Sequence, residues 1–191
     1  MSTDNLKLLD KFLIFFYNRT MNNIEKSSFR ERIADFRLPR YNELPDVGLY
    51  LEQVIKYING KLSPLGWQEI TSSMVSNYVK KNVIPAPEKK QYFADQLGYL
   101  IFISITKTVL SIENISLLIK LQKDSYKPDV AYNYFCDEFE NMLRSICGLD
   151  AQNTVHATNN DEKSLLRSVI IAVSHIAYAN SCFETKKESI K

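Results

Sequence analysis

Residues 70–83 read ITSSMVSNYVKKNV, and the spacing of their apolar side chains predicts the structure of this region. An apolar residue occurs at positions i, i+4, i+5, i+8 and i+9, which lie on one helical stripe: Ile70, Met74, Val75, Tyr78 and Val79. Asn82 follows and tolerates the left-handed conformation that ends many helices. The pattern predicts a compact helix over about residues 71–81 with one buried face.

The opposite face of this predicted helix carries small polar and basic side chains and no acid. Small side chains let a helix approach base edges in the major groove, Asn can pair with adenine, and Lys neutralises phosphates. We therefore expect base contacts from Ser72, Ser73, Ser76 and Asn77, and phosphate contacts from Lys80 and Lys81. The alternative is an ordinary surface helix whose lysines suit the negative end of the helix dipole.

Residues 84–91, IPAPEKKQ, follow this helix and predict a short basic turn. Pro85 and Pro87 prevent the helix from continuing. Further phosphate contacts are then expected from Lys89, Lys90 and Gln91, and residues 72–91 hold four lysines against one glutamate. The pattern indicates a recognition helix followed by a small wing.

A second helix is predicted upstream of this segment. Asp46 is a good N-cap for a helix that runs to about residue 59, and Gly60 is expected to end it. Residues 61–69, with Pro64 and Gly66, should form a loop. The two helices together suggest a helix-turn-helix, although their connection is longer than the three or four residues of a standard turn.

The rest of the chain predicts further helices, because its 5 glycines and 6 prolines leave few breakers outside residues 39–87. Ser111 should cap one helix, while Pro128 begins another that Gly148 ends. We expect an extended linker over residues 38–45 and a loop over 150–160. The fold class is therefore all-α, a helical bundle with helices over residues 4–17, 23–35, 94–109, 112–121, 128–147 and about 25 residues from Asp161.

The net charge of +2 is divided unevenly along the chain. Residues 1–123 carry +5, residues 124–162 carry −6 and residues 163–191 carry +3. This division permits the first half to bind a polyanion, although blocks of charge also form ordinary solvated faces.

Cysteine usage and hydropathy indicate the compartment. Cys136, Cys147 and Cys182 form no Cys-x-x-Cys pair and are expected to be packed thiols in a reducing environment. The apolar run at residues 12–17 is too short for a signal peptide, and the run at 165–179 is too short to span a bilayer. We expect a cytoplasmic protein with no membrane partner.

No sequence pattern indicates catalysis, a cofactor or a metal site. The chain contains no G-x-x-x-x-G-K-[ST], G-x-G-x-x-G or G-x-S-x-G motif. His156 and His175 have no acid or cysteine nearby at ligand spacing. The acids at positions 137, 138 and 140 are typical of a solvated helix face. We therefore expect a protein that is not an enzyme and binds no cofactor.

Residues 74–118 resemble the winged helix-turn-helix of the MerR regulators, and the resemblance extends over residues 70–120. In that family, a helix with a tyrosine ends in a Gly-Leu-Ile-like step and a proline. A wing that ends in a tyrosine follows, then a helix with spaced Leu, Phe and Ile, and then a Ser-Leu-x-x-Ile cap with a further helix. The matching residues occur here in the same order: Tyr78, Asn82-Val83-Ile84-Pro85, Tyr92, Leu97, Leu100, Phe102, Ile103, Ser111-Ile112, Ile115 and Leu118. The resemblance implies a DNA-binding fold with a short wing.

The chain also departs from the MerR pattern. Ser76 stands where that family has an arginine, and the wing is reduced to residues 88–91, so the family's groove preference does not carry over. Upstream, residues 38–54, LPRYNELPDVGLYLEQV, resemble the leader of an uncharacterised bacterial family, the domain of unknown function 1836. That second resemblance extends to the whole chain and implies no particular activity.

These patterns predict three regions: residues 1–45 with N-terminal helices and a linker, residues 46–123 with the DNA-binding helix-turn-helix, and residues 124–191 for dimerisation or sensing. We hypothesise a transcription regulator that binds double-stranded DNA as a homodimer, joined through its last helix, with an effector in the C-terminal half. Two alternatives remain open. One is a protein-interaction adaptor, and the other is a small-molecule-binding helical protein that uses the aromatic-rich residues 126–139.

Overall fold

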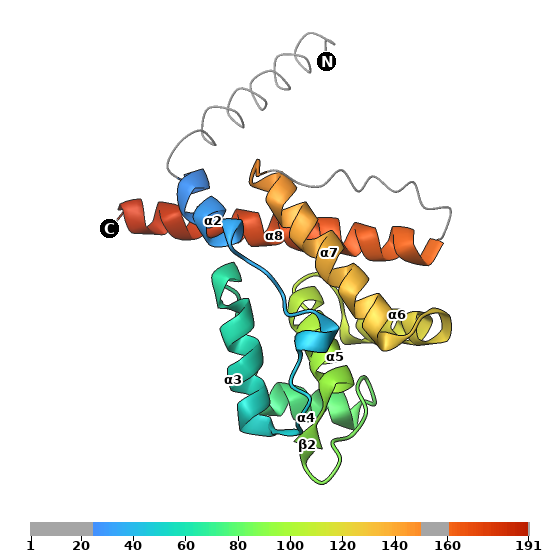
Figure 1. Ribbon diagram of the computed structural model, residues 1–191. Helices are drawn as coiled ribbons and strands as arrows, with labels where there is room; N and C mark the ends of the chain where they lie inside the picture. Colours follow the sequence, from blue (N-terminus) through green and yellow to red (C-terminus); the bar gives the residue numbers. More distant parts are fainter. Residues whose placement is uncertain (1–24, 150–160, 191) are drawn as a thin grey trace, which may run out of the picture.

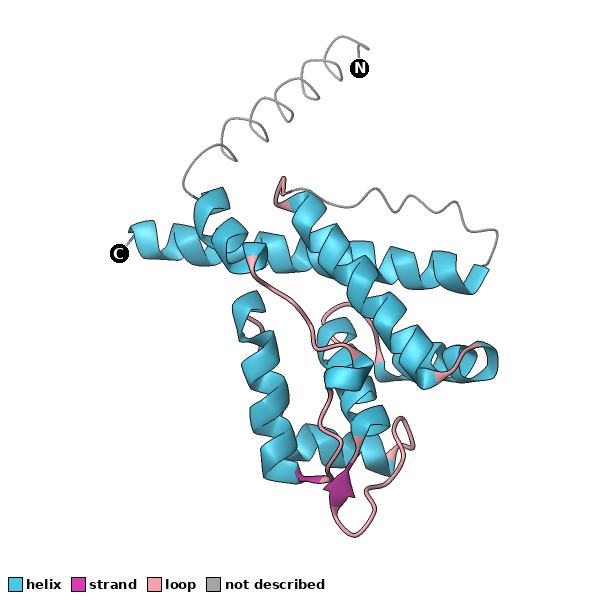
Figure 2. Cartoon of the chain, in the orientation of Figure 1, coloured by secondary structure: helices cyan, strands magenta, loops and turns pink. Residues whose placement is uncertain are grey.

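The computed structural model describes residues 25–149 and 161–190, which form seven α-helices and one small antiparallel sheet (Figure 1). The all-α class is confirmed, and Figure 2 shows how little of the chain is strand. The expected helix over residues 4–17 and the expected loop over 150–160 lie outside the described residues. The elements are α2 (Glu25–Ala34), η1 (Tyr41–Glu43), β1 (Leu49–Tyr50), α3 (Leu51–Leu62), η2 (Ser63–Leu65), α4 (Ser72–Lys80), β2 (Gln91–Tyr92), α5 (Ala94–Thr106), α6 (Ile112–Ser125), α7 (Pro128–Ile146) and α8 (Asp161–Ile190).

Helix α5 is the centre of the hydrophobic core. Its side chains are apolar nearly all round, and every residue from 96 to 106 except Phe102 is buried. It contacts α3 on one side and α6, α7 and α8 on the others. A single cluster of buried side chains continues from Phe29 in α2 to Tyr178 in α8, so the described parts of all three predicted regions share one core.

The helices divide the molecule into two ends, as Figure 1 shows. At one end α8 packs against α7 and α2. At the other end lie α3, α4 and the small sheet, in which Leu49 pairs with Tyr92 and Tyr50 pairs with Gln91. Because α5 connects the two ends, it fixes the position of α4 relative to α7 and α8.

Several predicted helix boundaries are confirmed. The Thr71 hydroxyl accepts a hydrogen bond from the Met74 amide at the start of α4, and Asn82 follows that helix with a φ of +55°. The Ser111 hydroxyl caps α6 in the same way. Pro128 begins α7, and Gly148, with a φ of +64°, follows its last turn. Local capping rules therefore located these helix ends correctly.

The predicted boundaries of α3 were wrong at both ends. Asp46 is not its N-cap, because residues 49–50 pair with β2 as a strand and the helix begins only at Leu51. Gly60 does not end it either, since the helix continues to Leu62 and into η2. The left-handed residue that ends this run is Gly66, with a φ of +68°, which a glycine adopts without strain.

Residues 36–46, which we call the strap, were predicted to contain an extended linker over 38–45. The backbone is extended at Arg40 and Leu44, as predicted, but the segment is not a free linker. Leu38 is fully buried, Leu44 is 5% exposed, and the η1 turn interrupts the extended backbone. The strap connects α2 to β1 and lies against α7, where the Tyr41 amide donates to the Asn133 side chain. It is therefore part of the folded core and not a spacer.

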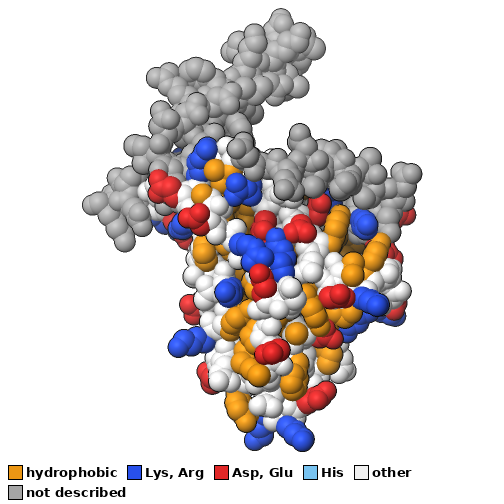
Figure 3. Space-filling view, viewed as in Figure 1, with side chains coloured by type: hydrophobic (Ala, Val, Ile, Leu, Met, Phe, Trp, Pro, Cys, Tyr) orange, Lys and Arg blue, Asp and Glu red, His pale blue; other side chains and the backbone are white. Residues whose placement is uncertain are grey.

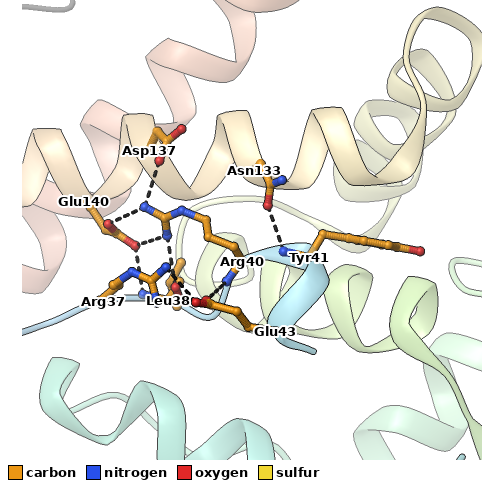
Figure 4. A network of polar contacts seen from close by, with 8 residues as sticks. All are labelled: Arg37, Leu38, Arg40, Tyr41, Glu43, Asn133, Asp137 and Glu140. Atoms are coloured by element: carbon orange, nitrogen blue, oxygen red, sulfur yellow. Dashed lines mark hydrogen bonds and ion pairs between the residues drawn. The ribbon is translucent and has the colours of Figure 1, made fainter. Parts of the chain in front are cut away.

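An ion pair between Arg40 and Glu140 holds the strap on α7 (Figure 4). The two guanidinium nitrogens donate to the two carboxylate oxygens of Glu140 at 2.6 and 2.8 Å. The Arg40 side chain also donates to Asp137 at 2.8 Å, and the Leu38 amide donates to Glu140 at 2.8 Å. The hydrogen bond with Glu140 raises the pKa of Arg40, so this cation stays charged. Both side chains are largely shielded from water, which strengthens the pair.

The same network corrects the expectation that the acids of α7 form a solvated face. Glu140 is half-buried against the strap, and Glu138 is only 8% exposed. Asp137 alone of the three remains exposed, and it too contacts Arg40. The residues that pair with this face come from about 100 positions upstream, beyond the reach of helical periodicity.

Helix α8 is the one described helix that is long and apolar enough, by length and composition, to cross a membrane. Of its most apolar window, 39% is buried inside the protein. Core helices of soluble proteins pass the same test, and α8 packs against α7 and α2. Length and composition therefore do not place it in a bilayer.

We predict that Arg40→Ala lowers the free energy of unfolding by about 2 to 4 kcal/mol, because it leaves the shielded Glu140 carboxylate without its counter-charge. Urea denaturation monitored by circular dichroism measures the change. Arg37→Ala is the matched control, since Arg37 makes the same two-pronged contact with Glu43 on the open surface, at 2.8 and 3.0 Å. The control should change little, and equal losses for the two variants would contradict the anchoring role of Arg40.

Candidate nucleic-acid interface

Helix α4 is held across the end of α3 by two side-chain contacts. The Asn59 amide in α3 accepts from the Ile70 amide at 2.9 Å and donates to the Ile70 carbonyl at 3.1 Å. About two turns earlier in α3, Glu52 accepts a hydrogen bond from the Ser72 hydroxyl at 3.2 Å. These contacts hold the end of the connection that leads into α4, and the connection itself includes the extra turn η2.

The buried and exposed faces of α4 agree with the pattern read from the sequence. Val75 is fully buried and Tyr78 is 7% exposed, while Met74 and Val79 are half-buried against the core. Most of the predicted contact residues lie on the exposed face: Ser73, Ser76, Asn77, Lys80 and Lys81. Ser72 is half-buried instead, because it faces Glu52. The exposed face of α4 itself therefore presents small polar groups and two lysines.

Residues 88–91 form a two-residue β-turn that we call the basic turn. The Glu88 amide donates to the Gln91 carbonyl at 3.0 Å, and the Gln91 amide returns a bond to Glu88 at 2.8 Å. Lys89 and Lys90 occupy the tip with φ values of +48° and +68°. Such a turn favours Asn-Gly. At positive φ a Cβ atom crowds the backbone, so glycine is unstrained there and Asn tolerates the conformation better than most residues. Two lysines in these positions therefore lower the stability of the fold. The hydrogen bonds within the turn give no reason for having lysine there.

The basic turn projects from the small sheet at the same end of the molecule as α4 (Figure 1). Figure 3, in the same orientation, shows Lys and Arg side chains at this tip. Lys89 and Lys90 are exposed, whereas Gln91 is half-buried and its side-chain amide lies 3.5 Å from the Gly48 carbonyl. A Cβ on Gly48 would lie 2.8 Å from the Gln91 Cβ, so only glycine allows β1 to approach this closely. The turn is thus positioned by β1.

The structure adds acids to this surface that the sequence pattern did not reveal. Glu113, at the start of α6, lies 3.8 Å from the Lys81 ammonium. Hydrogen bonds from its own backbone and from Ser111 lower the pKa of Glu113, and the Lys81 charge adds to this effect, so the acid is ionised at neutral pH. Because Glu52 and Glu113 lie 20 and 32 positions from their partners, only the fold brings them here. They reduce the positive charge around α4.

We predict that replacing the tip of the basic turn by Lys89→Asn with Lys90→Gly raises the free energy of unfolding by about 1 to 2 kcal/mol, because it removes the backbone cost of positive φ. Thermal or urea denaturation measures this change. The matched control is Lys89→Gln with Lys90→Gln, which removes both charges and keeps both side chains on the strained backbone. A gain in the control as large as in the Asn-Gly variant would show that charge repulsion, not backbone strain, is relieved.

The family model described as Domain of unknown function (DUF1836) matches residues 39–135. The match begins in the strap, includes α3, α4, the basic turn, α5 and α6, and ends within α7. Comparisons with curated proteins and with solved structures each found no match. Because the matched segment covers more than half of the 191 residues, the chain belongs to the family described as Domain of unknown function (DUF1836).

Proposed function

We propose that this protein is a DNA-binding transcription regulator that lays α4 in the major groove and places the basic turn on the flanking phosphates. In this proposal the basic turn acts as the wing does in the MerR regulators, and the protein works in the cytoplasm without catalysing a reaction. The observation that carries the proposal is the pair of lysines at the strained tip of the turn. Among residues 25–149 and 161–190 no contact requires this backbone cost, which is a reason to look for an external ligand, and two ammonium groups suit a polyanion.

The exposed face of α4 supports a division of roles among its side chains. Ser73, Ser76 and Asn77 are small enough to let the helix axis approach the bases, and Asn77 can pair with adenine. Lys80 and Lys81 follow at the C-terminal end and are exposed, as phosphate contacts require. Ser72 and Gln91 would have to leave Glu52 and Gly48 before they could contact DNA.

The flanking acids limit how strongly this surface can bind. Residues 72–91 carry a net charge of +3, and the contacts with Glu52 and Glu113 bring two negative charges beside α4. The net charge at the interface is therefore small for one subunit. This favours a dimeric form, in which two such surfaces act on one duplex and their affinities combine.

The experiment that tests this function is a titration of fluorescein-labelled duplex DNA at several salt concentrations. We predict that log Kd depends steeply on log salt, and that Lys89→Gln with Lys90→Gln flattens the slope by about two units, because each phosphate contact contributes about one. The Asn-Gly variant of the turn should lose affinity equally while it gains stability. Glu113→Gln releases Lys81 and should strengthen binding.

The Asn-Gly variant is expected to be more stable than the wild type. A loss of DNA affinity in this variant therefore cannot result from unfolding and must come from the missing lysine side chains. No binding at low salt, on genomic fragments that include the promoter of the protein's own gene, would contradict the proposal. If both turn variants keep the wild-type slope of log Kd against log salt, the basic turn does not contact DNA.

Dimerisation is proposed through α8, which has an apolar stripe on its solvent side. Leu165 is 45% exposed, Ile176 is 39% exposed and Phe183 is 62% exposed. Ala172 and Ala179, also exposed, fall between them. The five side chains follow one another at steps of seven, four, three and four residues, the spacing of helices that pack along their length. The buried face of α8 packs on α7 and α2, so the stripe is a second face.

We predict a sedimentation mass of about twice 22.1 kDa at micromolar concentration, and a monomeric mass for Ile176→Asp with Phe183→Asp. Circular dichroism of this variant should be unchanged, because both side chains are exposed in the monomer. Ile170→Asp provides the contrast, since Ile170 is 1% exposed and its replacement should unfold the protein. A wild-type chain that sediments as a monomer would contradict the dimer.

A further inference from the structure

An apolar cavity of about 140 Å³ lies between α5, α6, α7 and the first turns of α8. Aromatic and aliphatic side chains form most of its wall, among them Tyr99, Phe102, Ile119, Ala131, Phe135 and Leu166. The Phe102 and Phe135 rings meet edge to face with centroids 5.0 Å apart, so the aromatic part of the wall is well ordered by its own contacts. No part of the candidate nucleic-acid interface lines this space.

Two small residues on facing helices line the cavity. Gly98 of α5 has no side chain, and a Cβ placed there would lie 3.3 Å from the Tyr132 ring. Ala131 of α7 contributes only a methyl group to the wall. Apolar cavities of about 150 Å³ remain dry and bind benzene-sized molecules, because they offer few hydrogen bonds to water. The volume therefore fits one six-membered ring.

The charges around the cavity disfavour an anion. The charged residues on its wall are Asp95, Glu162 and Lys163. The Tyr41 hydroxyl donates to Asp95, a contact that raises the pKa of Tyr41 to about 12. The Lys163 ammonium lies over the Tyr126 and Tyr134 rings, 5.6 and 5.2 Å from their centroids, so those aromatic faces already have a cation. A neutral ligand matches this wall best, since a buried charge needs a partner.

The wall also carries polar groups that can orient a ligand, and Gln122 is one of them. The Gln122 side-chain nitrogen donates to the Tyr126 carbonyl at 3.2 Å. Its carboxamide oxygen has no donor within hydrogen-bond distance among residues 25–149 and 161–190, so it remains able to accept a bond. A ligand with one hydroxyl or N–H group on an aromatic ring would use both the apolar wall and this acceptor.

We propose that this cavity is a binding site for a neutral single-ring aromatic molecule that carries one hydrogen-bond donor, as a simple phenol does. The assignment rests on the volume, the aromatic wall, the charges of its rim and the Gln122 acceptor. It stands independently of whether the protein binds DNA.

The position of the cavity gives such a ligand a route to the candidate interface. Helix α6 supplies Ile119 and Gln122 to the cavity wall, and its first turn carries Glu113, which pairs with Lys81 beside α4. A ligand that shifts α6 would change the distance between Glu113 and Lys81. This coupling, unlike the binding itself, rests on the proposed function.

The test is a titration of the ¹⁵N-labelled full chain with p-cresol and with toluene, followed by amide chemical shifts. Saturable shifts should be confined to residues that line the cavity, with a Kd on the order of 1 mM or lower. Toluene lacks the donor and should bind more weakly than p-cresol. Benzoate, of similar size but charged, should bind at least about tenfold more weakly. Ala131→Phe fills the cavity and should abolish the shifts.

Ser145→Phe is the matched control, because it adds the same ring to an exposed position of α7 away from the cavity. Should Ala131→Phe not fold, nuclear Overhauser contacts from the p-cresol methyl group to Phe102 and Phe135 decide the site in the wild type. No saturable binding of either probe, binding that persists in folded Ala131→Phe, or benzoate binding as tightly as p-cresol would overturn the proposal.

A parallel DNA titration with saturating p-cresol separates the two claims. A change in DNA affinity in the wild type but not in Ala131→Phe supports the coupling. An unchanged DNA affinity refutes the coupling, while the amide chemical shifts still establish that p-cresol binds in the cavity. Absence of all DNA binding refutes the proposed function, and the chemical shifts then decide the cavity alone.

Discussion

The ion pair of Arg40 with Glu140 determines where the strap lies, and the strap in turn determines where β1 begins. Arg40 reaches both carboxylate oxygens of Glu140, and the same carboxylate accepts the Leu38 amide, so one acid holds both the side chain and the backbone of the strap. Ten residues after Arg40, β1 pairs with β2. The basic turn directly precedes β2, so a contact on α7 positions the lysines at the far end of the molecule.

This chain of contacts explains why the candidate interface belongs to the whole fold and not to a detachable segment. Helix α4 depends on Asn59 and Glu52 of α3, and the basic turn depends on the strand that follows the strap. Helix α5 packs against α3, and its Gln96 side chain donates to the Pro85 and Ala86 carbonyls between α4 and the basic turn. The family match likewise runs from the strap into α7 and includes every element of this end.

The sequence predicted those features that depend on neighbours within one or two turns. The faces of α4, its end before Asn82, the cap at Ser111 and the ends of α7 follow from periodicity and capping, and all of these are confirmed. The start of α3 was missed because a strand pair with β2 competes with the helix, and that partner lies about 40 residues away. The roles of Arg40, Glu113 and Gln122 were missed because their contacts are set by tertiary structure or by an adjacent cavity.

In the proposed function, α4 and the basic turn together form a surface for double-stranded DNA. The most direct measurement is a map of amide chemical-shift changes when the ¹⁵N-labelled full chain is titrated at low salt with a short duplex. We expect the largest changes within residues 72–81 and 88–91, and we expect them to disappear as salt is raised. Changes confined to α7 and α8, or no changes at all, would contradict the proposed function.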